Sequence, residues 1–318
     1  MKKNAGILGL LLAVVAITSL LDAKFLDPLN LQNIARWTGM YGILTVGAAF
    51  VIITGGIDLS VGSIVGLVGC LLPMLLKTGL PIPLAILSVF GVSLAIGWTH
   101  GMLVTKLRLQ PFLVTLCGLF IYRGIARYIT GDATQGFGTD FTELKVLTAS
   151  APLSVPTPFL MLLAIALASG ALLNFSVFGR YLLAVGSNEE AARLSGIRTS
   201  RVVISAYALS AGLAGLAGVL FAVDLNSIQP SGHGSFYELY AIAGAVLGGC
   251  SLRGGYGSFF GVVIGTAIVR VLYNAINILG IATQLEFAVI GFVILAGVIG
   301  DELVKRLSQR RGREHGPP

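Results

Sequence analysis

The stretch GMYGILTVGAAFVIITGGIDLSVGSIVGLVGCLLPMLL, residues 39–76, decides the fold class of this chain. Every residue in it except Asp58 is apolar, small or hydroxylic. A helix needs about 17–25 such residues to cross a bilayer, and the runs 39–55 and 60–76 each have that length. The stretch therefore indicates two membrane-spanning helices, with a glycine pair and one carboxylate between them.

The composition extends this interpretation to the whole chain. Of the 318 residues, 55% are hydrophobic and 11% are charged, whereas a soluble domain carries about 25% charged residues. We therefore predict an all-α polytopic membrane protein with about ten transmembrane helices, of which the eighth is short. The apolar runs are 5–21, 39–55, 60–76, 82–104, 111–129, 158–175, 202–223, 237–250, 257–279 and 281–299.

The basic residues predict how these helices are oriented. An even number of spans puts both termini on one side, and fourteen lysines and arginines fall in the termini and loops of that side. The opposite loops hold four. Since cytoplasmic loops carry the excess of positive charge, we expect both termini in the cytoplasm. This gives one transmembrane domain over 1–300 and a basic cytoplasmic tail over 301–318. The net charge of +7 is then an orientation signal, so the partner is the bilayer and nucleic acid is not expected.

Asp58 needs an explanation in so apolar a segment. Gly55 and Gly56 are suited to end the preceding helix, because glycine readily adopts the left-handed conformation that closes a helix. Asp58 and Ser60 can then accept hydrogen bonds from the free N–H groups that open the next helix. In the predicted topology this break lies near the cytoplasmic surface. It is either a plain helix cap, a broken helix at a gate, or a proton-coupling site.

The segment FGRYLLAVGSNEEAARLSGIRTSR, residues 178–201, is the long hydrophilic loop that faces the cytoplasm. Ser187 and Glu190 fit a capping box, and Gly196 is a suitable helix stop. The loop thus predicts a short helix of about two turns that carries Glu189, Glu190, Ala191 and Ala192. It is either a solvated connection or a docking element for a soluble partner.

The predicted ninth span carries four polar side chains. Arg270, Tyr273, Asn274 and Asn277 have the spacing that places them on one face of a helix. Polar groups at this depth face the bundle or a cavity rather than lipid. They either line a solute path or hold helices together by hydrogen bonds.

The sequence contains none of the common nucleotide-binding, metal-binding or catalytic motifs that we searched for. No lysine follows a glycine, so the phosphate-binding loop GxxxxGK[ST] is absent, and no CxxC or HExxH occurs. Cys70, Cys117 and Cys250 fall in apolar runs and are expected to be buried thiols. We therefore expect no catalytic residue, metal or cofactor. If the protein uses ATP, another chain must bind it.

Three segments carry a family resemblance. GGIDLSVGS (55–63), EAARLSGI (190–197) and ELYAIAGAVLGGCSLRGGYGSFFG (238–261) together resemble the permease subunits of ribose/xylose/arabinose-type ABC sugar importers. The resemblance implies a non-enzymatic subunit of the bacterial inner membrane that works with a second permease subunit, identical or closely related. It also implies a periplasmic binding protein that delivers a monosaccharide, and an ATPase that docks around Glu190 and Gly196 to drive alternating access.

Other solutes and other classes of protein stay open at this point. A permease of the same architecture could carry a branched-chain amino acid, a nucleoside or a signalling furanone. An ion-coupled secondary transporter would require a titratable group at mid-membrane, and by the predicted topology Asp58 is too near the cytoplasmic surface. A membrane enzyme would require a catalytic constellation, which the sequence lacks.

Overall fold

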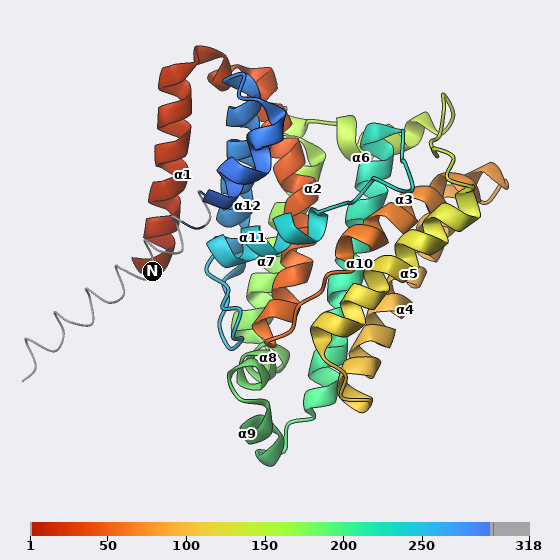
Figure 1. The fold of residues 1–318 in the computed structure, drawn as a ribbon, viewed down its shortest axis with the longest axis vertical. Coiled ribbons are helices and arrows are strands. Elements are labelled where there is room, and N and C mark those ends of the chain that lie inside the picture. Colours follow the sequence, from red (N-terminus) through yellow and green to blue (C-terminus); the bar gives the residue numbers. More distant parts are fainter. Residues whose placement is uncertain (1, 293–294, 296–318) are drawn as a thin grey trace, which may run out of the picture.

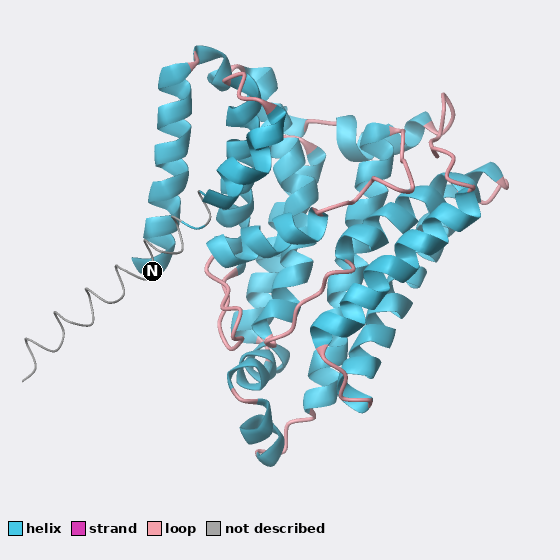
Figure 2. Ribbon diagram, viewed as in Figure 1, coloured by secondary structure: helices cyan, strands magenta, loops and turns pink. Residues whose placement is uncertain are grey.

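The computed structural model describes residues 2–292 and residue 295, and in this part of the chain the regular structure is helical (Figures 1 and 2). Short 3₁₀ helices lie in the connections: η1 (Ala23–Leu26), η2 (Thr142–Lys145), η3 (Pro152–Ser154) and η4 (Thr283–Leu285). The α-helices are α1 (Lys2–Leu21), α2 (Pro28–Ile53), α3 (Val61–Lys77), α4 (Ile82–Lys106), α5 (Pro111–Thr130), α6 (Val146–Ala149), α7 (Thr157–Phe175), α8 (Val177–Ser187), α9 (Glu189–Leu194), α10 (Thr199–Leu225), α11 (Tyr237–Leu247) and α12 (Phe259–Ile278).

Local sequence signals set several helix ends. Asp27 caps α2 by accepting a hydrogen bond of 2.8 Å from the Leu29 N–H, and Pro28 then occupies the first helical position. Pro111 likewise occupies the first position of α5, and Gly131 closes that helix in the left-handed conformation, with φ +59°. Helix α5 thus has nearly the bounds that the run 111–129 predicts, whereas α2 begins eleven residues before the predicted run 39–55.

Six helices of the described part are long and apolar enough to cross a membrane: α2, α4, α5, α7, α10 and α12. Four shorter apolar helices, within α1 and in α3, α8 and α11, accompany them. The run 237–250 forms the 11-residue α11, which rises roughly 16 Å and cannot cross a hydrocarbon layer of about 30 Å alone. The run 281–299 extends beyond the described residues, as does the tail 301–318. The protein is polytopic, and its number of crossings remains a prediction.

The centre of the bundle is built from α2 and α10, which pack against each other and against the surrounding helices (Figure 1). Every residue of α2 from Thr38 to Ile53 is buried. The peripheral α4, α5 and α7 instead turn large apolar side chains outward, such as Leu87, Phe120 and Leu167, which are 65%, 66% and 75% exposed. Such surfaces suit lipid rather than water, as expected for a membrane protein.

The break between α2 and α3 re-enters the bundle instead of forming a surface turn. Residues 54–60 run back alongside the helices as an irregular segment, and α3 begins inside the bundle (Figure 2). Residues 226–236 make a comparable irregular entry between α10 and α11. Gly62 of α3 packs so tightly on this second segment that an added Cβ atom would lie 2.2 Å from the Gly234 carbonyl oxygen.

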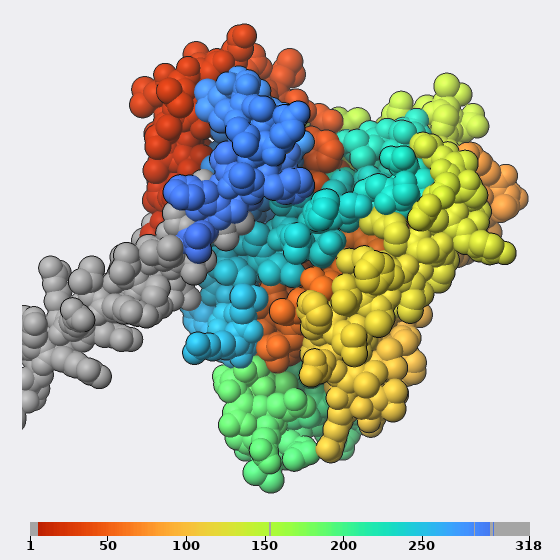
Figure 3. Space-filling model, viewed as in Figure 1, coloured from red at the N-terminus to blue at the C-terminus, as the bar shows by residue number. Residues whose placement is uncertain are grey.

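The segment 178–201 differs from its prediction. A single short helix was expected in a hydrophilic loop, but two helices form: α8 from Val177 to Ser187 and α9 from Glu189 to Leu194. They form a projection at one end of the molecule (green in Figure 3). The connections 107–110 and 248–258 lie toward the same end, and 22–27 and 131–156 toward the opposite one (Figure 1).

Candidate functional site

Asp58 is a buried carboxylate that joins the first break to α10. Its side chain is 2% exposed. One carboxylate oxygen accepts from the Ser60 N–H at 3.0 Å and from the Ser60 hydroxyl at 2.6 Å. The other accepts from the Ser210 hydroxyl at 2.9 Å. The carboxylate thus has three hydrogen-bond donors and no contact with bulk water.

This placement corrects the expectation that Asp58 lies near the cytoplasmic surface. Its partner Ser210 follows the start of α10 at Thr199 by eleven residues, which is roughly 16 Å along a helix. The segment enters the bundle because the hydroxyls of Thr115 and Tyr207 donate to the Ile57 carbonyl, at 3.2 and 3.4 Å. Nearness to the surface is therefore no argument against a coupling role for Asp58.

The glycine pair closes α2 as its sequence suggests. Gly55 has φ +83°, and the N–H groups of Gly55 and Gly56 donate to the carbonyls of Ile52 and Val51 at 2.9 and 3.1 Å. These bonds satisfy two carbonyls at the helix end. The backbone therefore turns sharply at this point, back toward the interior.

The end of α2 also contacts two segments from the second half of the chain. The Gly255 N–H donates to the Ile53 carbonyl at 2.9 Å. Gly186 of α8 lies so close that an added Cβ atom would be 1.8 Å from the same oxygen. The first break, the 248–258 loop and α8 are therefore packed backbone against backbone.

Helix α9 projects beyond this contact. Asn188, not Ser187, is its N-cap, and the Asn188 side chain accepts from the Ala191 N–H at 2.9 Å. The predicted capping box is wrong because the Ser187 hydroxyl donates instead to the Leu183 carbonyl within α8, at 2.9 Å.

The other predicted residues of this segment lie on or just after α9. Glu189, Glu190 and Ala191 are exposed, whereas Ala192 is buried. Leu194 is 80% exposed at the end of the helix. Gly196 follows at φ +84°, a conformation that other residues adopt only with strain. The helix is thus anchored on one side and presents carboxylates and a leucine on the other.

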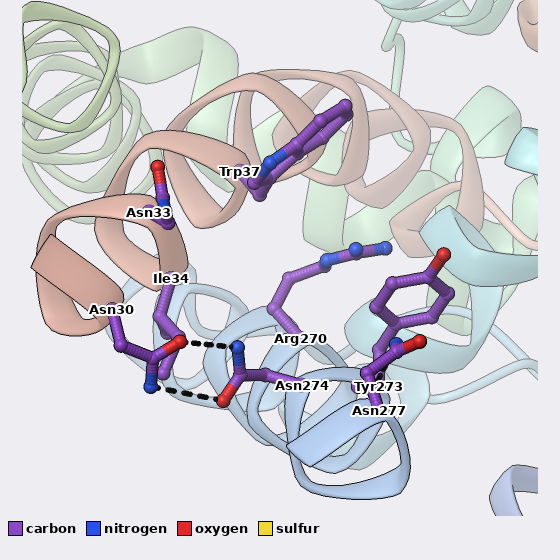
Figure 4. A pocket seen from close by; sticks show the side chains of 8 residues that line it. All are labelled: Asn30, Asn33, Ile34, Trp37, Arg270, Tyr273, Asn274 and Asn277. Carbon is purple, nitrogen blue, oxygen red and sulfur yellow. Dashed lines mark hydrogen bonds between the residues drawn. The ribbon is translucent and has the colours of Figure 1, made fainter. Parts of the chain in front are cut away.

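The four polar residues of α12 line one pocket between α2 and α12 (Figure 4). The pocket encloses about 300 Å³. The side-chain amides of Asn30 and Asn274 bond each other reciprocally at 3.1 and 2.7 Å, which fixes both orientations. Its lining residues are Asn30, Asn33, Ile34, Trp37, Arg270, Tyr273, Asn274 and Asn277.

Sequence reasoning missed the half of this pocket that α2 contributes. Asn30, Asn33 and Trp37 are spaced by three and four residues, which is the same helical periodicity that identified the α12 residues. This signal is present in the sequence, but 30–37 precedes the apolar run that begins at residue 39. The α2 half of the pocket therefore lay outside the predicted span.

Arg270 is the buried charge of the pocket. The residue is 6% exposed, and its guanidinium lies over three aromatic rings, those of Tyr41 at 4.3 Å, Tyr273 at 4.4 Å and Trp37 at 5.8 Å. Such cation–π contacts stabilise a desolvated cation. Nearby, the Tyr240 hydroxyl donates to Glu286 at 2.8 Å.

His100 has no recognisable motif in the sequence, yet it lies in the interior near the first break. It is 2% exposed, and its Nε2 atom pairs with the Tyr122 hydroxyl at 2.7 Å. Its ring also packs edge-on against Tyr207. The described residues contain no cluster of His, Cys, Asp and Glu with the makeup of a metal site.

Comparison with known proteins gives the family. Residues 30–298 match the model of a family described as branched-chain amino acid transport system / permease component. The chain is 38% identical to the ribose import permease protein of Bacillus subtilis, over 95% of this chain and 93% of that protein.

Further relatives agree. The ribose import permease protein of Escherichia coli K12 is 38% identical over 92% of this chain and 91% of that protein. The xylose transport system permease protein of the same strain is 31% identical over 96% of this chain and 94% of that protein. No solved structure matches the chain. The chain therefore belongs to this family of permease components, which are non-catalytic subunits of ABC importers.

Proposed function

We propose that this chain is the membrane-spanning subunit of an ABC importer for a monosaccharide of the pentose type. The observation that carries this is similarity along nearly the whole chain to permeases of ribose and xylose import. The chain is a multi-pass protein of the bacterial inner membrane, and a separate subunit hydrolyses ATP. A periplasmic binding protein delivers the sugar to the outer face.

The ATPase docks on α9. Its exposed Glu189, Glu190 and Leu194 offer charge and apolar surface at the end of the molecule that the basic loops assign to the cytoplasm. Helix α8 joins α9 to the rest of the bundle, and its backbone contact with Ile53 links α9 to the break at Asp58. ATPase motion transmitted through α8 would therefore act on that break, which serves as the gate. A second permease subunit, identical or closely related, completes the pathway.

The sugar crosses along α12, past Arg270, Tyr273, Asn274 and Asn277. The family description also names branched-chain amino acids, which carry an ammonium group. None of the residues that line the pocket is acidic, so the pocket offers no partner for that charge. Amides, a guanidinium and aromatic rings suit a neutral, hydroxyl-rich solute better.

Purification and uptake test the proposal. The protein is extracted in mild detergent from its native membrane, and its partners are identified by mass spectrometry. We expect a stoichiometric ATPase, and ribose or xylose uptake by proteoliposomes that requires ATP and the binding protein. Uptake driven by an ion gradient without a partner, or ATP-dependent uptake of leucine but not of pentoses, would contradict it.

A further inference from the structure

Arg270 has hydrogen-bonding capacity that the described part of the chain leaves unused. The described residues give it no hydrogen bond and no ion pair, and its Nε–H is buried without an acceptor. A guanidinium has five N–H donors, and a buried donor left unpaired is costly. The side chain nevertheless points into the pocket between α2 and α12 (Figure 4). The terminal N–H groups are not among the buried unpaired atoms, so they are the donors that a ligand in that pocket can reach.

The walls of the pocket are aromatic and amide, not acidic. The rings of Trp37 and Tyr273 lie beside Arg270 and give flat apolar surfaces. Asn30 and Asn274 are held by each other. The Asn277 side-chain amide donates to the Tyr273 carbonyl at 2.8 Å, and its own oxygen can act as an acceptor.

We infer that this pocket is a binding subsite for one monosaccharide, in which Arg270 donates to adjacent sugar hydroxyls and Trp37 packs against the apolar C–H face of the ring. A monosaccharide presents hydroxyls around its edge and C–H groups on its faces, which matches this pairing of polar and aromatic groups. A volume of about 300 Å³ is at the small end for ligand sites. The inference rests on the proposed function, because it assigns the imported solute to a site.

The two tryptophans of the chain give a direct binding assay. Trp37 lines the pocket, whereas Trp98 lies on α4, away from the pocket, with 54% of its surface exposed. In Trp98→Phe, all tryptophan emission from this chain comes from Trp37. We expect a saturable change of this emission when ribose or xylose is added to the full permease–ATPase complex. Trp37→Phe, in which the emission comes from Trp98 and from any tryptophans of the ATPase, should not respond.

Two further variants test the polar contacts. In Trp98→Phe, Arg270→Gln should raise the sugar concentration for half-maximal response roughly tenfold or more, because hydrogen bonds from a charged donor are lost. Asn277→Leu should weaken the response and lower ATP-dependent uptake several-fold. Its matched control is Asn174→Leu on α7, where another exposed asparagine makes the same bond to the carbonyl four residues earlier, also at 2.8 Å. That variant should behave as wild type.

The outcomes separate the subsite from the proposed function. If the wild-type complex imports a pentose but Trp37 is silent and Asn277→Leu imports normally, the subsite is wrong and the proposed function stands. If inorganic phosphate changes the Trp37 emission and sugars do not, the pocket is an anion site and the inference fails. If no pentose is imported at all, the proposed function fails first.

Discussion

At the scale of single residues, Asp58 shows how a carboxylate can lie inside an apolar bundle. Its oxygens accept from a backbone N–H and two hydroxyls, so the group is hydrogen-bonded although no cation among the described residues pairs with it. Bonds to a charged acceptor are about twice as strong as neutral ones. The capping contact to Ser60 could be predicted from neighbouring residues. The contact to Ser210, 152 residues later, could not.

Replacing Asp58 distinguishes a structural acceptor from a coupling group. Asp58→Asn keeps an acceptor for Ser60, and the Ser210 hydroxyl can rotate to accept from the new amide, so the fold should persist with little loss. Asp58→Leu leaves the three donors unpaired and should cost about 3 kcal/mol or more. Thermal unfolding in detergent measures both. Asp58→Asn as unstable as Asp58→Leu would contradict this account.

Uptake by Asp58→Asn then tests the proposed role of this break as a gate. If the residue acts as a hydrogen-bond acceptor that holds the break in place, the folded variant should import the sugar at a rate close to wild type. A stable Asp58→Asn protein without transport would instead point to a coupling role for the charge.

At the scale of elements, small residues set how closely the helices approach. Gly97 of α4 lies against α10, where an added Cβ atom would be 2.3 Å from the Tyr207 carbonyl oxygen. Six residues earlier on the same helix, Gly91 has open space around it. Only the packing of α4 on α10 distinguishes these two glycines.

This difference predicts opposite results for one substitution. Gly97→Ala should force α4 and α10 apart and destabilise the protein by about 1–3 kcal/mol. Gly91→Ala should be neutral or stabilising by up to about 1 kcal/mol, because alanine favours the helix. The midpoints of thermal unfolding of the two variants compare them directly. Equal destabilisation would show that the α4–α10 contact is not as close as described.

The proposal that α9 is the docking helix makes a prediction of its own. Glu190 is exposed, and within the described residues its one ion pair is with Arg193, at 3.9 Å. Glu190→Lys should therefore leave the melting temperature unchanged, since exposed ion pairs contribute little, yet abolish ATPase copurification and uptake. Glu143→Lys, the same reversal in η2 at the opposite end, is the control and should bind the ATPase normally. Normal ATPase binding by Glu190→Lys would place the docking surface elsewhere.

At the scale of the whole molecule, the charge distribution predicts the orientation in the membrane. The 178–201 segment and the 131–156 connection lie toward opposite ends (Figure 1). Since the basic loops are assigned to the cytoplasm, the exposed Ser195 and Thr139 should lie on opposite sides of the membrane.

Labelling of cysteines tests this orientation. In a background without native cysteines, Thr139→Cys should react with a membrane-impermeant maleimide in spheroplasts, where the outer face is open to the reagent. Ser195→Cys should react only after the membrane is disrupted. The reverse pattern would invert the topology and move α9 away from the ATP-containing compartment.

The sequence by itself determined what depends on composition and on neighbours along the chain. Low charge and long apolar runs require lipid-embedded helices, the glycines of 55–56 stop α2, and the periodicity of 270–277 places four polar groups on one face. The motifs of 55–63, 190–197 and 238–261 likewise indicated the family that the comparisons confirm. Each of these signals lies within a few helical turns of sequence.

Only the tertiary structure decided what depends on distant segments. The depth of Asp58 follows from its contact with Ser210, the second wall of the Arg270 pocket comes from Asn30, Asn33 and Trp37, and α8 packs on the end of α2. These contacts join residues far apart in the chain, and a polar or glycine residue alone does not specify its partner. The physical reason is that packing selects among many pairings that local sequence leaves equally possible.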